Sequence, residues 1–308
     1  MNSGISAEED KKNIEKLIIE TNEYENILSN ALKPNELSIW ESLEVNESYP
    51  IFSYDASFPD KSDYLKTGVM SGFMNKLMSG KIEEKYNDAC LEYKIEKQRL
   101  LKEYIYNKVQ FEKDKTERNV EADFLKYHYK NGEKTAVEKY ADTVISCSQY
   151  PESLKIRYKT YYTRTEKKLT VNFLLPELND LLTDRGILIN NKDVLTETIL
   201  KKIEKNFYER TLISIGIRTM YELFEAISSE LVRKIAFNGY VPTNESAWEN
   251  IDFSGHMRCI FSMESTREKF SDINLYTEEP LKIAESLNLL RVKNFSDPMQ
   301  LIAPIKVQ

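Results

Sequence analysis

A run of basic and aromatic residues at positions 154–168, LKIRYKTYYTRTEKK, has the residue types that bind nucleic acid. It holds six basic residues, one acidic residue and three tyrosines, whereas the whole chain carries a formal charge of -7. Apolar and polar residues alternate, which predicts a strand whose basic side chains stand about 6.6 Å apart on one face. Such a row could follow a phosphate backbone, and a tyrosine on the same face could stack on a base. The candidate nucleic-acid-binding residues are Lys155, Arg157, Lys159, Tyr161, Arg164, Lys167 and Lys168.

The same pattern is also typical of a strand with a solvated, lysine-rich outer face that discourages pairing with other strands. The sequence pI of about 5.3 makes the chain acidic as a whole. Because uniform negative charge repels phosphates, any nucleic-acid contact must come from a local patch such as this one. Both interpretations of the basic run therefore stay open.

The other residues that could carry chemistry are few and scattered. Cys90, Cys147 and Cys259 lie far apart and the chain has only two histidines, so we expect neither a disulfide framework, nor a metal site, nor a cofactor. The glycines lack the spacing of a phosphate-binding loop. Glu83-Glu84-Lys85 imitates the acidic and lysine residues of a metal-dependent nuclease, but it falls in a charged helical stretch with no preceding strand. We therefore expect no catalytic residues and no enzyme activity.

The composition is that of a soluble protein with many helices, since 30% of the 308 residues are charged and 41% are hydrophobic. The first residues, MNSGISAEEDKK, are polar and acidic, unlike a secretory signal. No apolar stretch approaches the ~20 residues that cross a bilayer. We expect a cytoplasmic protein that does not enter a membrane.

Residues 81–131 contain neither Gly nor Pro and carry 12 basic and 11 acidic residues, which predicts a long helical arm. Ile82, Tyr86, Ala89 and Tyr93 have the alternating spacing of a coiled-coil seam, but polar residues then enter the register. The arm could separate two domains in solvent, or a partner subunit could grip it. The sequence favours neither role.

Beyond Pro151 the pattern predicts a hairpin over 154–175 with one buried face, a long core helix over 196–228, strands over 231–241 and 256–264, and a helix over 279–289. A short apolar run at 187–189 could pair with the hairpin, and Gly216 would allow close packing of the core helix. The fold class is α+β, with the long coiled-coil-like arm followed by an antiparallel sheet packed on long helices. The predicted segments are 1–79 (a helix and an irregular stretch), 80–149 (the charged arm) and 150–308 (the α+β domain, in the order β-β-α-β-β-α).

Several motifs resemble a bacterial family. They are EKYADTVIS at 138–146 with Tyr150-Pro151, RTMYELFEA at 218–226, FNGYV at 237–241, TREKF at 266–270 and Ala303-Pro304. Together they are similar to restriction-system proteins, in which this region precedes an Mrr-type endonuclease domain. The likeness is best over residues 136–308, and the chain ends near the point where the nuclease domain of those relatives would begin.

The resemblance implies a non-catalytic accessory or scaffold subunit of a restriction or anti-phage defence system that docks a nuclease or ATPase partner. The first alternative is a nucleic-acid-binding module that uses the basic run for DNA or RNA. The second is a metal-dependent nuclease. The sequence leaves the oligomeric state open.

Overall fold

The computed structural model describes residues 19, 21–31, 39–65, 76–178, 181, 197–243, 253, 257–275, 278–297 and 299–306, with side chains from 205 onward in the helix that begins at 197. Contacts divide the chain into two compact units. One is Trp40–Asp123, and the other joins Met1–Ile39 to Phe124–Gln308. We call them the arm unit and the sheet unit. The predicted segments 1–79, 80–149 and 150–308 were drawn from composition and pattern, whereas these units are defined by contacts, so the segment boundaries stay a prediction.

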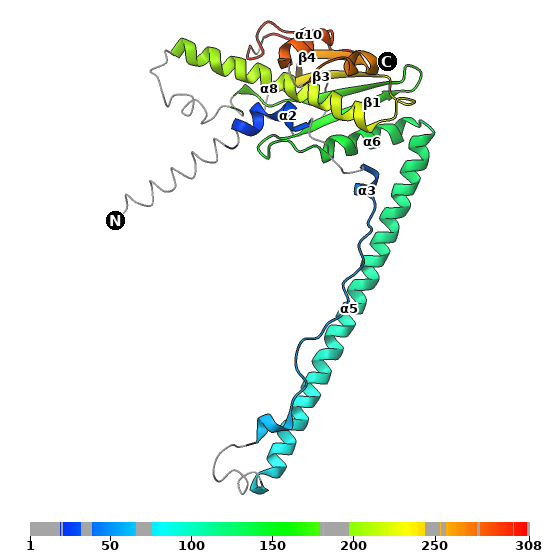
Figure 1. Cartoon of the computed structure of the whole chain (residues 1–308), viewed down its shortest axis with the longest axis vertical. Helices are drawn as coiled ribbons and strands as arrows, with labels where there is room; N and C mark the ends of the chain where they lie inside the picture. Colours follow the sequence, from blue (N-terminus) through cyan, green and yellow to red (C-terminus); the bar gives the residue numbers. More distant parts are fainter. Residues whose placement is uncertain are drawn as a thin grey trace, which may run out of the picture. The chain divides into compact units, whose positions relative to one another are not determined.

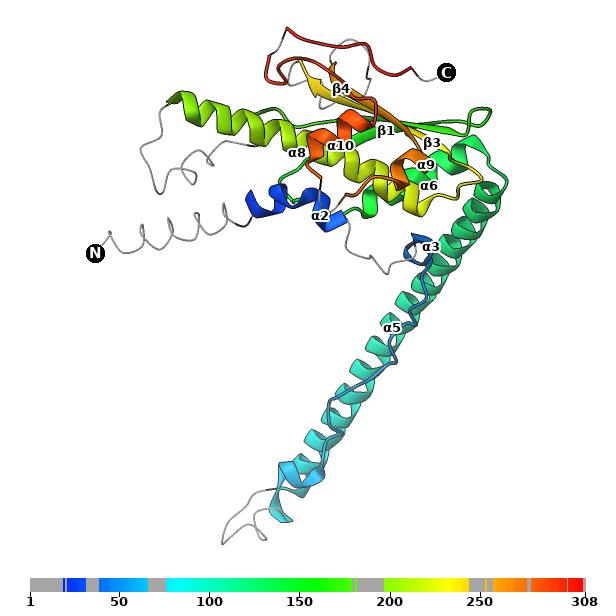
Figure 2. The ribbon, with the colours of Figure 1, turned by 45° about the horizontal axis from the view of Figure 1, so that its top comes forward.

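The arm unit is built on helix α5 (Ser79–Lys130), which confirms the predicted long helix. An extended segment, residues 45–64, lies along it in the opposite direction and ends in the short 3-10 helix η1 (Lys61–Tyr64), as Figures 1 and 2 show. We call residues 45–64 the strap. At one end Asn119 Oδ1 accepts a hydrogen bond from Val45 N at 2.8 Å. At the other, the rings of Tyr64 and Tyr86 lie 6.2 Å apart.

Aromatic rings hold the strap against α5. The ring centroids of Tyr49 and Phe52 each lie 5.3 Å from that of Tyr104, and Tyr54 and Phe58 both pack on Tyr93. The predicted seam residues thus face an extended chain in the described part of the arm. The coiled-coil character predicted from their spacing is not confirmed in the described part of the arm. On the solvent side Arg99 donates to Glu96 and Glu103, which adds a few tenths of a kcal/mol per pair to the helix.

The sheet unit contains a five-stranded sheet in the order β1 (Arg157–Thr163), β2 (Lys168–Leu174), β3 (Lys234–Pro242), β4 (Met257–Thr266) and β5 (Leu290–Arg291). The predicted hairpin is present as the antiparallel pair β1 and β2. The prediction of an all-antiparallel sheet is wrong, because β2 and β3 pair in parallel. Helix α8 (Glu197–Ala226) connects these two strands. A helix that packs on its own sheet carries the chain back to the end where the previous strand began, so the next strand runs parallel to it.

Helices α6 (Lys134–Cys147) and α8 cover one face of the sheet, as Figure 2 shows, with α10 (Pro280–Ser286) packed on α8. The residues that α8 buries include Leu212, Ile213, Ile217, Met220 and Leu223. A Cβ on Gly216 would lie 2.6 Å from Met263 Cε and 3.1 Å from a ring carbon of Phe237, so the glycine lets α8 pack close to β3 and β4. This confirms the close packing predicted for Gly216.

The opposite face of the sheet is covered by the C-terminal segment, residues 299–306. Ile302 N donates to Cys259 O at 2.9 Å, and Ile302 packs on a cluster that includes Leu174 and Tyr240. As a consequence β2 is buried on both faces, whereas its alternating sequence predicted one buried face. The solvent-exposed face of the hairpin is therefore limited to strand β1.

The remaining predicted elements agree in type and approximate position. Helix α8, strands β3 and β4, and helix α10 lie where the core helix, the two strands and the last helix were expected. Helix α2 (Ile27–Ala31) lies within the helix predicted at the start of segment 1–79, and the structure adds α3 (Ile39–Leu43) and α9 (Arg267–Ser271). The apolar run at 187–189 and the start of the 256–264 strand, at residue 256, lie outside the described residues.

Candidate functional site

The basic hairpin places part of the predicted nucleic-acid patch on one exposed face. Arg157 and Lys159 are exposed and alternate with less exposed positions of β1, and the half-buried Tyr161 follows on the same face. Lys159 Nζ lies 5.5 Å from the centre of the Tyr161 ring, so the ring already holds a cation. Lys155 precedes the strand and is exposed. These positions have the alternation that the sequence predicted.

The turn of the hairpin is less cationic than its sequence suggests. Arg164 is exposed, whereas Lys167 has a positive φ of 48° and its Nζ lies 3.9 Å from Glu230. Lys168 is only 7% exposed, and its Nζ lies 3.0 Å from Glu264 Oε2. Lys234 approaches the other oxygen of Glu264 at 3.4 Å. Lys168 therefore belongs to a buried ion pair and does not extend the exposed patch, since β2 is covered on both faces.

A row of buried polar side chains crosses the sheet beside this patch. Backbone register places Asn172 and Asn238 next to each other on β2 and β3, followed by Ser262 on β4. Asn238 Nδ2 donates to Asn172 Oδ1 at 2.8 Å and to Ile305 O at 3.0 Å, while Asn238 Oδ1 accepts from Ile305 N at 3.0 Å. The Asn238 side-chain amide thus bonds both backbone groups of Ile305, as the backbone of a neighbouring strand would. These groups hold that segment and offer no free nucleophile.

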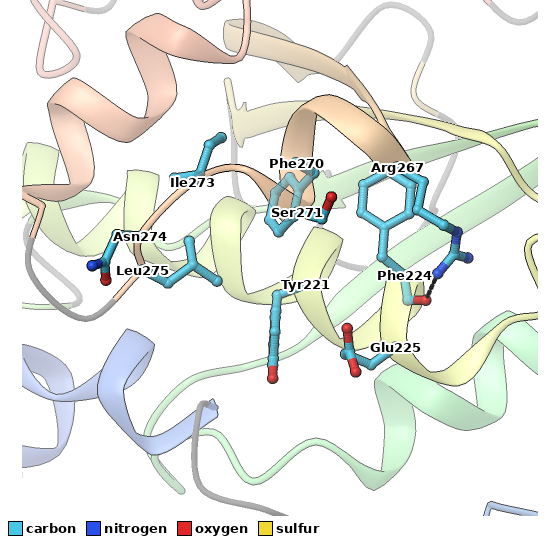
Figure 3. A pocket seen from close by; sticks show the side chains of 9 residues that line it. All are labelled: Tyr221, Phe224, Glu225, Arg267, Phe270, Ser271, Ile273, Asn274 and Leu275. Carbon is cyan, nitrogen blue, oxygen red and sulfur yellow. Dashed lines mark hydrogen bonds between the residues drawn. The ribbon is translucent and has the colours of Figure 1, made fainter.

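A pocket of about 360 Å³ lies beside the C-terminal end of α8. Figure 3 shows Tyr221, Phe224 and Glu225 on one wall and Arg267 and Phe270 on the other. The Arg267 guanidinium donates to the carbonyl oxygen of Phe224 and, at 2.7 Å, to that of Ile227. It therefore caps carbonyls that the end of a helix leaves without partners. Burial lowers the pKa of Arg267. The arginine thus closes the C-terminal end of α8.

Comparisons with known proteins give no lead to the site. No family model, curated protein or solved structure matches the chain. The motifs that resemble restriction-system proteins hold structural contacts. The guanidinium of Arg218 lies 4.5 Å from the centre of the Tyr150 ring, Thr266 accepts from Lys269 N to cap α9, and Arg267 caps α8.

The residues considered for metal chemistry are not brought together. Within the described residues, no three His, Cys, Asp or Glu side chains gather where they could hold a metal ion. Of the triplet at 83–85, Glu83 pairs with Lys61 of the strap. Burial raises the pKa of the Cys259 thiol to about 11, so this cysteine is a poor nucleophile at neutral pH. No helix among the described residues is long and apolar enough to cross a membrane.

The arm carries a surface that the sequence reading missed. Leu91, Ile95, Ile105 and Val109 of α5 are each more than half exposed, and Leu101 and Tyr106 flank them. At 100° per residue these four positions lie about half a turn from the seam that faces the strap. We call residues 91, 95, 98, 102, 105 and 109 the outer stripe. The alternating spacing of four and three residues is present in the sequence. Residues 82–93 have the same spacing on the opposite side of α5, and the predicted seam includes only that side.

Proposed function

We propose that the chain is a non-catalytic accessory subunit of a bacterial restriction or anti-phage defence system, which docks a nuclease or ATPase partner through its arm. The observation that carries this proposal is the outer stripe. A helix that already packs one face on the strap has no need of further apolar residues, yet four large aliphatic side chains remain in water on the other face. Burying one such side chain yields about 1.5–3 kcal/mol, so the stripe favours a protein partner. The resemblance of residues 136–308 to restriction-system proteins supports a role in a restriction or anti-phage defence system.

Affinity purification of the tagged chain from its bacterial host tests the docking. We expect mass spectrometry to recover a nuclease or ATPase, and Ile95→Lys with Ile105→Lys to reduce that recovery at least tenfold because two charges enter the apolar stripe. Met299→Lys is the matched control, since Met299 is 87% exposed in the sheet unit and should leave recovery unchanged. Recovery of the bare chain, or equal recovery with the parent chain, the double variant and the control, would contradict the proposal.

A nucleic-acid-binding module is the second candidate, favoured by the shared exposed face of Arg157, Lys159 and Tyr161. For this function, fluorescence anisotropy should show short DNA or RNA binding that weakens between 50 and 200 mM salt. Arg157→Glu with Lys159→Glu should then remove about two units from the slope of log K against log salt. Lys85→Glu with Lys113→Glu changes the net charge equally on the arm and serves as control. Equal loss in both variants would indicate general repulsion and eliminate the hairpin site.

A further inference from the structure

We propose that the outer stripe binds a second copy of this chain, with the two α5 helices antiparallel and the two-fold axis at the level of residue 100. The inference rests on the proposed function and deepens it: two copies pair through the stripe, and the nuclease or ATPase docks on the dimer that results. Substitutions in the stripe then reduce recovery of that partner by separating the two copies.

The spacing of the stripe is that of a helix–helix seam. Its six positions follow one another by four, three, four, three and four residues, which is the repeat of core positions in a two-stranded coiled coil. The strap covers the other side of α5, as the contacts of Tyr93 and Tyr104 show. A second helix could therefore approach the stripe without displacing the strap.

The order of residue types along the stripe selects the second copy as its occupant. The residues are Leu91, Ile95, Gln98, Lys102, Ile105 and Val109. Reversed about position 100, this order again places apolar on apolar and polar on polar. Leu91 then meets Val109 of the other copy, Ile95 meets Ile105, and Gln98 meets Lys102. A two-fold interface requires such self-complementarity, because each patch contacts itself in reverse.

Other arrangements of two copies fit less well. In a parallel dimer Lys102 would face Lys102 in the core. Moving the antiparallel pair by one heptad in one direction sets Leu91 opposite Lys102, and in the other direction sets it opposite Thr116. The two shifted registers exchange apolar contacts for polar ones, whereas the parallel dimer keeps the apolar layers but sets two like charges against each other in its core. The register about residue 100 keeps four apolar layers, and Leu101 meets its own counterpart beside the axis.

The flanking charges predict how salt should act. Across the proposed interface Lys94 would lie near Lys108 of the other copy, and Arg99 would lie near its counterpart. Each Arg99 already pairs with Glu96 and Glu103, which compensates its charge. The lysines repel each other, and salt screens such repulsion between exposed charges. The dimer should therefore tighten as salt increases, the opposite of nucleic-acid binding.

Sedimentation equilibrium of the full chain at 1–100 µM tests the stoichiometry. We expect a reversible dimer, a dissociation constant at least 50-fold weaker with Ile95→Lys and Ile105→Lys, and no change with Met299→Lys. Circular dichroism of each variant shows whether the helix persists. A monomer at all concentrations and salt levels overturns the inference. If partner recovery still depends on Ile95 and Ile105, the docking proposal stands without the dimer.

Disulfide trapping tests the direction of the helices. In a Cys90→Ser, Cys147→Ser background, one chain carries Ile95→Cys and another carries Ile105→Cys. The antiparallel register predicts that an oxidised mixture forms the mixed disulfide several-fold faster than either chain links to itself. Faster self-linking of each single variant would indicate a parallel dimer and overturn the proposed register. Absence of any linked species, in a protein that sediments as a dimer, would place the interface elsewhere and also overturn it.

Discussion

Replacing Arg218 with methionine should lower the free energy of unfolding of the sheet unit by about 3–4 kcal/mol. Arg218 is only 3% exposed, and its Nε donates to Glu222 Oε1 at 2.8 Å. Its Nη1 donates to Ile27 O at 3.3 Å and so connects α8 to α2. The guanidinium also stacks on Tyr150. Methionine fills the space of the stem but leaves the Glu222 carboxylate without its cation in a largely buried place.

Urea denaturation of the single and double variants distinguishes a lost ion pair from lost packing. Arg218→Met with Glu222→Gln removes the unpaired charge and should recover at least 1 kcal/mol relative to Arg218→Met alone. Burial raises the pKa of Tyr150, so this residue is a neutral phenol at pH 7, where it hydrogen-bonds Thr219 at 2.8 Å. A double variant no more stable than the single one would show that the charge of Glu222 is not the cause.

Changing Asn238 to aspartate should destabilise the sheet unit by a similar amount, about 3 kcal/mol at pH 7. Asn238 is 1% exposed, and its side-chain amide donates two hydrogen bonds and accepts two, the second of them from Ser262 Oγ at 2.7 Å. A carboxylate cannot donate to Ile305 O or Asn172 Oδ1. It would place a charge between acceptors with no cation to compensate it.

The pH dependence of this variant has a defined sign. Burial would raise the folded-state pKa of the new carboxyl above its unfolded value of about 3.9. The penalty is then absent below the unfolded pKa, where both states are protonated, and grows as pH rises toward the folded pKa. Urea midpoints should therefore differ less from the parent at pH 4 than at pH 7. Asn107→Asp, on the exposed surface of α5, should stay within about 0.5 kcal/mol at both pH values. Equal effects of the two substitutions would contradict the role assigned to Asn238.

Local patterns predicted the elements of the sheet unit well. The alternation over 154–175 predicted the hairpin, and the wide apolar stripe around Ile213 and Ile217 predicted a core helix. The same patterns could not predict burial that depends on distant segments. Lys168 is buried beside Glu264, on β4, which supplies its counter-charge. This pairing of distant residues leaves no periodic signal in the sequence near Lys168.

The candidate surfaces also include features that local sequence patterns predict and features that depend on distant segments. Arg157, Lys159 and Tyr161 share a face because strand geometry alone determines it, so their placement followed from the sequence, while binding stays a prediction. The helical arm also followed, from the absence of Gly and Pro. The irregular course of the strap was also predicted, but its position along α5 was not, because aromatic contacts with Tyr93 and Tyr104 determine it. The spacing of the outer stripe is present in the sequence, but only the structure shows that the strap leaves this side of α5 exposed.

The pairing of a helix with an extended chain constrains how this protein can change in length during evolution. Between the contacts of Tyr86 with Tyr64 and of Asn119 with Val45, 33 residues of α5 pass 19 residues of the strap. At 1.5 Å per helical residue the strap advances by about 2.6 Å per residue. Deleting one strap residue alone would shift every aromatic ring beyond it off its partner. A deletion of seven helical residues together with four strap residues keeps both the facing and the rise. Homologous arms should therefore shorten or lengthen in such coupled steps, and a lone insertion should be found only beyond the ends of the strap.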